Sequence, residues 1–175
     1  MRASPIFLLF FILLSCKPAE EKAFKAPYAD IKGFFEAEVL RLTRNKSAVD
    51  KTIEQNGLSE TKTSLSIDWE NELSLFTGSD INKAAWQDSY KIIEDSSSVS
   101  YHAIDPNLRT REIRIIKDIN GKPRQIKIKN ISRNYLYESS ETLIYIPDSA
   151  YSIDKNQKVI LLGKNSYRIN AEIIK

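Results

Sequence analysis

The chain has 175 residues, a formal net charge of +3 and a hydrophobic fraction of 42%, which together are typical of an ordinary globular domain. Its single cysteine excludes an internal disulfide or a site of several thiolates, and its single histidine has no partner for a zinc site. The five glycines form no phosphate-binding loop, and no nucleophile lies in a recognisable catalytic context.

The N-terminus combines one arginine with an apolar run from Ile6 to Leu14. This pattern is typical of a secretory signal peptide. The run is too short to cross a bilayer, since a spanning helix needs roughly 20 residues. We therefore expect residues 1–15 to be a leader that directs export.

The run ends in Leu13-Leu14-Ser15-Cys16, which resembles the lipobox of bacterial lipoproteins. The resemblance implies cleavage before Cys16 and acylation of that residue with fatty acids such as palmitate. Lys17 follows where an aspartate would favour the inner membrane, so the resemblance implies an outer-membrane lipoprotein. The alternative is an ordinary secreted protein with a spare cysteine.

Residues 16–27 are polar and proline-bracketed, and they predict a flexible tether that begins at the lipidated cysteine. Residues 28–175 are then one domain. Residues 30–44 predict its best helix, with Asp30 as the cap and an apolar stripe of Ile31, Phe35, Val39 and Leu42.

Residues 49–67 predict a hairpin closed by Asn56-Gly57, with Thr52 opposite Thr61 and Ile53 opposite Glu60. Asp68 should cap a short helix that carries Trp69, Leu73 and Phe76, and a second helical segment should follow at residues 80–87.

Strand patterns then follow one another with short connections, which require an antiparallel sheet. The expected strands are residues 90–94, 98–105, 111–119, 122–131, 135–146, 159–162 and 167–173, with a turn at residues 163–166.

Most of the basic character lies in residues 109–133, which hold 9 Lys/Arg against 2 Asp/Glu, a net charge of +7. A two-residue turn at Asn120-Gly121 would place Ile113 opposite Ile128 and Ile115 opposite Ile126 on one face. The other face would carry Glu112 and three cations, which we take as a candidate surface for an anionic partner: Arg114, Lys127 and Lys129. The alternative is a solvated face whose field is offset by the acidic first half.

The sequence thus predicts an α+β fold: a curved antiparallel sheet with an N-terminal helix and a short helical pair on one face. The order of elements resembles the half-barrels of lipoprotein carriers in the bacterial envelope, an analogy that does not establish function. We expect a lipid-anchored envelope lipoprotein with a structural or protein-interaction role, with no catalytic residue, metal or cofactor. Its partners would be the membrane, through Cys16, and an envelope protein, lipid or glycan, but not nucleic acid. Two alternatives are a carrier of an amphiphilic ligand between helices and sheet and, more distantly, a hydrolase with converging carboxylates.

Overall fold

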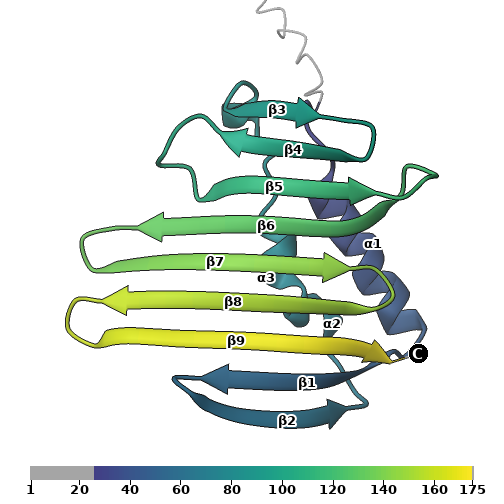
Figure 1. Cartoon of the computed structure of the whole chain (residues 1–175), viewed down its shortest axis with the longest axis vertical. Helices are drawn as coiled ribbons and strands as arrows, with labels where there is room; N and C mark the ends of the chain where they lie inside the picture. The colour runs from purple at the N-terminus through teal and green to yellow at the C-terminus, as the bar shows by residue number, and fades with distance from the viewer. Residues whose placement is uncertain (1–25, 175) are drawn as a thin grey trace, which may run out of the picture.

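The computed structural model describes residues 26–174, so Cys16, the leader and most of the tether lie outside the described residues. The strands are β1 (Ala48–Gln55), β2 (Leu58–Ser64), β3 (Tyr90–Glu94), β4 (Ser98–Ala103), β5 (Thr110–Lys117), β6 (Pro123–Arg133), β7 (Tyr137–Ile146), β8 (Ala150–Val159) and β9 (Gly163–Ile174). They form one open antiparallel sheet in the order β2-β1-β9-β8-β7-β6-β5-β4-β3 (Figure 1).

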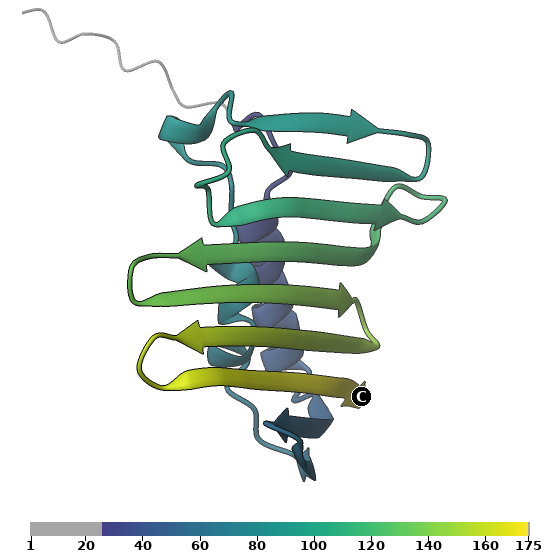
Figure 2. The same ribbon diagram turned by 60° about the vertical axis from the view of Figure 1, so that its left-hand side comes forward.

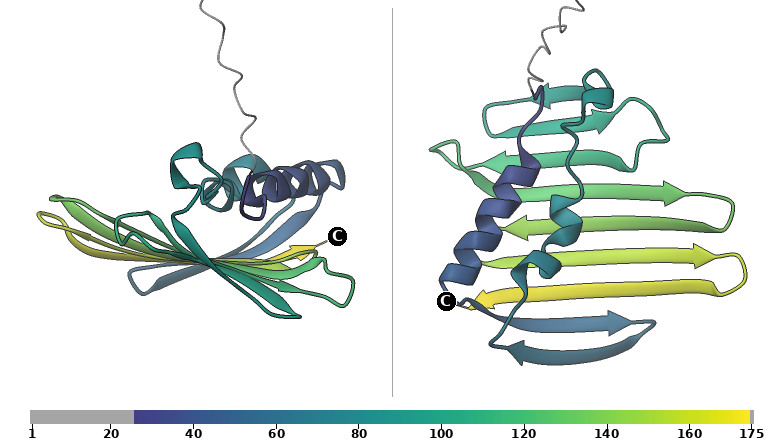
Figure 3. Two further views of the ribbon diagram at one scale, coloured as in Figure 1. Left: turned by 90° about the horizontal axis from the view of Figure 1, so that it is seen from above. Right: turned by 180° about the vertical axis from the view of Figure 1, so that it is seen from behind.

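The helices all pack on one face of this twisted sheet (Figure 3). They are α1 (Ile31–Arg44), α2 (Trp69–Glu72) and α3 (Ser74–Thr77), with a 3-10 turn, η1, at Ala84–Trp86. The predicted α+β class and its layers are confirmed. The expected helix at residues 80–87 is wrong beyond that single turn, because only three residues there are helical.

Helix α1 begins and packs as its sequence predicts. The Asp30 carboxylate accepts a hydrogen bond of 2.8 Å from the Gly33 amide, which satisfies one of the free N–H groups of the first turn. A Cβ on Gly33 would lie 2.2 Å from that carboxylate, so glycine leaves the room that the cap needs. Ile31, Phe35 and Leu42 are buried against the sheet.

The Asn56-Gly57 hairpin has the predicted register, with Thr52 opposite Thr61 and Ile53 opposite Glu60. Both turn residues have positive φ, 51° and 87°, as a type I′ turn requires. In this β1–β2 hairpin, β1 pairs with β9, and β2 forms one edge of the open sheet.

The basic hairpin, β5–β6, also has the predicted pairs Ile113–Ile128 and Ile115–Ile126. Its turn is longer than predicted, because Gly121 donates to the Asp118 carbonyl and the register shifts by one residue beyond Ile116. Asn120 therefore does not take positive φ, and Gly121 alone does, at 77°.

The prediction for residues 159–166 is wrong, and residues 147–158 were assigned no element. Residues 159–162 were expected to form a strand and residues 163–166 a turn, but Ile160, Leu161 and Leu162 lie in the turn itself. The missing strand is β8, which pairs with β7 on one side and β9 on the other. Its polar second half gave no apolar alternation, because that half extends beyond the helices.

The core fills the space between helices and sheet with aromatic and branched side chains. Its largest members exposed by 2% or less are Trp69, Tyr145, Tyr151, Phe35 and Phe76. Phe35 stacks on Phe76 with ring centroids 4.9 Å apart, and Tyr145 meets both rings edge-on. A ligand between these layers would have to displace packed side chains.

We predict that Ile128→Ala lowers the free energy of unfolding by about 2–5 kcal/mol, because Ile128 is fully buried and its loss leaves a cavity. The control is Ile131→Ala on the same strand, where the side chain is 42% exposed and a change below about 0.5 kcal/mol is expected. Urea denaturation measures both. Equal losses would show that the two faces of β6 are wrongly assigned.

Candidate functional site

The face of the sheet opposite the helices is uncovered in the described part of the chain (Figure 3). Alternation along each strand points apolar residues toward the helices and leaves polar ones on this outer face. One cross-strand row runs through most of the sheet and consists of Ser100, Arg114, Lys127, Ile144, Ser152, Asn170 and Thr52.

The three cations predicted from the basic segment do share this outer face. Arg114 on β5 lies directly opposite Lys127 on β6, and Lys129 lies opposite Glu112. Arg114 is exposed and Lys127 half-buried. Like charges directly opposite each other in a sheet are destabilising, so this pairing must be tolerated at some cost to stability.

Lys129 contributes less free charge than the sequence suggested. Its Nζ lies 2.7 Å from Glu112 Oε2, and that hydrogen bond, with smaller contributions from His102 and Lys127, holds the pKa of Glu112 below its usual value. In the described part of the chain, Arg114 and Lys127 have no carboxylate within 4.0 Å. We call Arg114 and Lys127 the cationic pair.

On the other half of the outer face the mid-strand charges are paired, but at the far end Lys158 and Lys164 have no carboxylate within 4.0 Å among the described residues. Arg168 on β9 contacts Asp154 on β8 at 2.9 Å and Glu54 on β1 at 3.5 Å. The cationic pair therefore remains a candidate anionic-partner surface in the middle of β5 and β6, where two cations face each other without a carboxylate. His102 lies on β4 opposite Glu112, next to this region. Among the described residues, no group of three His, Cys, Asp or Glu side chains could hold a metal ion.

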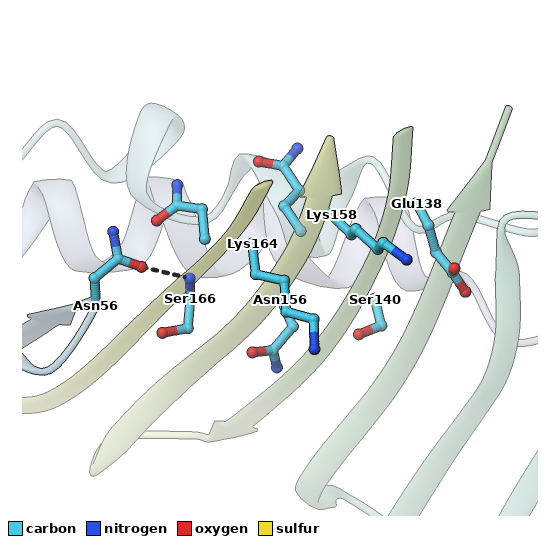
Figure 4. Close-up of a pocket in the computed structure, with 9 residues that line it drawn as sticks. Asn56, Glu138, Ser140, Asn156, Lys158, Lys164 and Ser166 are labelled. Atoms are coloured by element: carbon cyan, nitrogen blue, oxygen red, sulfur yellow. Dashed lines mark hydrogen bonds between the residues drawn. The ribbon is translucent and has the colours of Figure 1, made fainter. Parts of the chain in front are cut away.

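A polar groove of about 620 Å³ lies where β7, β8 and β9 extend past the helices (Figure 4). Lys158 lies opposite Lys164 and Asn156 opposite Ser166. Asn56 Oδ1 accepts a hydrogen bond of 2.9 Å from the Ser166 amide, which ties the β1–β2 turn to the groove. This groove is absent from the sequence-based expectations because β8 is absent from them; the run from residue 150 to residue 159, which contains no glycine or proline, was the available signal.

On the helix side, buried carboxylates already have partners. Glu141 is 7% exposed, and its oxygens lie 2.7 Å from Arg109 and 3.1 Å from Lys155. Burial alone would raise the pKa of Glu141, but the Lys155 hydrogen bond and the Arg109 charge lower it below 4.5. The carboxylate is therefore ionised and neutralised at neutral pH.

Two further carboxylates join helices to strands. Glu38 on α1 accepts from Tyr145 Oη at 2.5 Å and from Arg41. Glu72 on α2 accepts from Tyr151 and, at 2.6 Å, from Lys51. Burial and the nearby carboxylates raise the pKa of both tyrosines, so the hydroxyls remain donors. These contacts fix the helix layer on the sheet.

Known proteins give no further guide to this site. No protein family matches the chain, and no curated protein is similar to it in sequence. Among the described residues, none of the helices is long and apolar enough to span a bilayer.

We predict that Glu141→Gln lowers the free energy of unfolding by about 1–3 kcal/mol at pH 7, because two cations lose a buried charged acceptor. The folded-state pKa of Glu141 lies below the ordinary glutamate value of 4.5, so this contribution is present above pH 4.5 and disappears as the pH falls through the folded-state pKa. The difference between wild type and variant should shrink accordingly.

Urea denaturation at a series of pH values below and above 4.5 measures this difference. Glu138→Gln is the matched control on the same strand, where the carboxylate is exposed and pairs only with Arg133 at the surface. It should leave the stability near that of wild type. A Glu141→Gln difference that stays constant with pH would contradict the assigned pKa.

Proposed function

We propose that this protein is a lipid-anchored lipoprotein of the cell envelope that acts as a binding platform and holds a partner against the outer face of its sheet. The observation that carries the proposal is this uncovered nine-strand face, in which Arg114 and Lys127 lie opposite each other in mid-strand without a carboxylate partner in the described part of the chain. An outer-membrane location follows from the lipobox resemblance and from Lys17.

The filled core supports a binding surface over an internal ligand site. Residues such as Tyr145 and Tyr151 occupy the space in which a carrier would hold an amphiphile. The buried carboxylates Glu38, Glu72 and Glu141 are each held by cations or hydroxyls from neighbouring elements, which supports a structural role for them. An anionic envelope protein, lipid or glycan fits the cationic pair.

The anchor is tested by metabolic labelling with a fatty-acid analogue in a bacterial host. We expect Cys16 to be labelled and residues 1–15 to be removed. Cys16→Ser should abolish the label and leave the leader uncleaved, since cleavage in lipoproteins follows acylation. The control adds Ser96→Cys to Cys16→Ser; a cysteine in an exposed turn should not restore the label. Labelling that survives in Cys16→Ser would overturn the anchor.

The outer-face role is tested by reversing the cationic pair, Arg114→Glu with Lys127→Glu. Lys129 is left in place, because its change would also break the pair with Glu112. The double variant should keep the fold, because both side chains point away from the core, and lose binding to anionic partners in a pull-down from envelope extracts. The loss should shrink at high salt.

The matched control reverses two exposed cations away from this face, Lys46→Glu in the α1–β1 turn and Lys62→Glu on β2, so that net charge changes by the same amount. Partners lost with the first variant and kept with the second would support the proposal. Partners lost equally with both would show that net charge alone matters, and partners indifferent to both would remove this face from consideration.

A further inference from the structure

Six large apolar side chains gather at three turns of the sheet and stand in solvent. Their exposed fractions run from 67% to 96%. The turns are β1–β2, β6–β7 and β8–β9. The residues are Leu58, which begins β2 directly after the first turn, and Tyr135, Leu136, Ile160, Leu161 and Leu162 within the other two. We call these six residues the apolar edge.

Topology places the three turns at the same end of the strands, since each closes an antiparallel hairpin whose first strand runs in that direction (Figure 1). The β6–β7 and β8–β9 hairpins project well past the helices (Figure 2). The hairpin turns at the opposite end are residues 95–97, 118–122 and 147–149, in which Ile119 is the single exposed large apolar side chain of the described structure. Leu65 follows β2 at that end, and Ile104 lies in the β4–β5 connection at the same end as the apolar edge.

Hydrogen bonds hold the apolar edge in shape. The Ile160 amide donates to the Leu136 carbonyl at 3.0 Å and so joins two neighbouring turns. Asn134 Oδ1 accepts from the Leu136 and Tyr137 amides at 2.8 and 2.9 Å. The side chains therefore stay exposed because the backbone is fixed by these bonds and by the long strands behind it.

Cations lie directly behind the apolar tips. Lys158 and Lys164 face each other across β8 and β9, two residues from Ile160 and Leu162, and Arg133 ends β6 just before Tyr135. Glu138, which pairs with Arg133, is the carboxylate among them. Apolar tips, an aromatic ring and then a band of positive charge follow the order of acyl chains, interface and phosphates in a bilayer.

We propose that the apolar edge rests on a lipid bilayer, with its leucines and isoleucines among the upper acyl chains and Lys158 and Lys164 at the phosphates. A bilayer fits better than a second copy of the chain, because a copy of this edge would bring the same lysines together. Peripheral domains commonly bury apolar side chains about 5–10 Å into the interface in this way.

The chain outside the described structure is long enough for this orientation. Tyr28 packs on Tyr101 of β4, which lies in the cross-strand row of Ile113 and Ile128. Seven residues separate Ile128 from Tyr135, or about 23 Å along the strand. Residues 16–26 can span at most about 33–36 Å. An anchor at Cys16 and the apolar edge can therefore contact one membrane together, and each would raise the local concentration of the other.

The test uses residues 17–175 without the anchor, so that it is independent of acylation; every described helix and strand lies within this span. Co-sedimentation with phosphatidylcholine vesicles containing one quarter phosphatidylglycerol should show binding. The triple variant Leu136→Ser, Leu161→Ser, Leu162→Ser should lower the partition coefficient at least about tenfold, since three apolar side chains no longer leave water.

The matched control removes three exposed apolar side chains away from the edge: Leu40→Ser, Ile93→Ser and Ile119→Ser. It should bind as wild type does. A second readout is Tyr135→Trp, whose fluorescence should be quenched by brominated lipid more strongly than that of Trp69 and Trp86 in wild type.

Each outcome decides the proposal. The proposal is supported if the edge variant loses vesicle binding while the control variant keeps it, and if brominated lipid quenches the tryptophan at position 135. Absence of vesicle binding by wild type, or equal loss in both triple variants, overturns it. Dimers in sedimentation equilibrium that only the edge variant abolishes, without vesicle binding, would assign the edge to a second copy instead.

Discussion

The alternation of side chains along the strands is the constraint on which the rest of the structure depends. It gathers Ile113, Ile128, Leu143, Ile153 and Ile169 into one row across five strands, and this row supplies the floor on which the helices pack. A shift of one residue in the pairing of any hairpin would move its apolar side chains from the helix-covered face to the solvent-exposed face. The turns, which set the register of the strands, therefore determine which side chains enter the core as much as the apolar residues do.

Aromatic rings and buried carboxylates together join the helices to this floor. Tyr145 and Tyr151 rise from β7 and β8 with their rings among Phe35 and Phe76, and their hydroxyls reach carboxylates on the helices. Each ring is thus apolar where it is packed and hydrogen-bonded at its tip. Because the partners are charged, these bonds also select one position of α1 and α2 over the sheet.

The sequence predicted the parts of the fold that local chemistry decides. The Asp30 cap, the Asn56-Gly57 turn and the isoleucine register of β5–β6 each follow from a few neighbouring residues, and each is confirmed. The outer-face position of Arg114 and Lys127 followed from that register. The pairing of Lys129 with Glu112 was also open to prediction, because the same register places them opposite each other.

The strand and turn that were not predicted, β8 and residues 160–162, depend on how far the helices cover the sheet. Beyond the helices a strand has water on both faces, so the second half of β8 needs no apolar alternation. Conversely, an apolar run such as Ile160 to Leu162 can form a turn when nothing covers it. Alternation of apolar and polar residues arises when one face of a strand is buried. It therefore cannot predict a strand where the sheet extends past its core.

In the half of the sheet that projects past the helices, apolar residues are not explained by burial in the core. Edge strand β2 faces solvent with Ser59, Glu60 and Thr61, as expected of a strand that must not pair with another chain. The same molecule nevertheless exposes Leu161 and Leu162 in a turn, where folding gains nothing from them. An orientation with these turns on a membrane would stand the strands upright and turn the outer face, with Arg114 and Lys127 in the middle of its strands, sideways along the membrane surface. A partner held there would lie beside the domain and above the membrane surface, so the anchor, the apolar edge and the cationic pair would act on neighbours on one membrane.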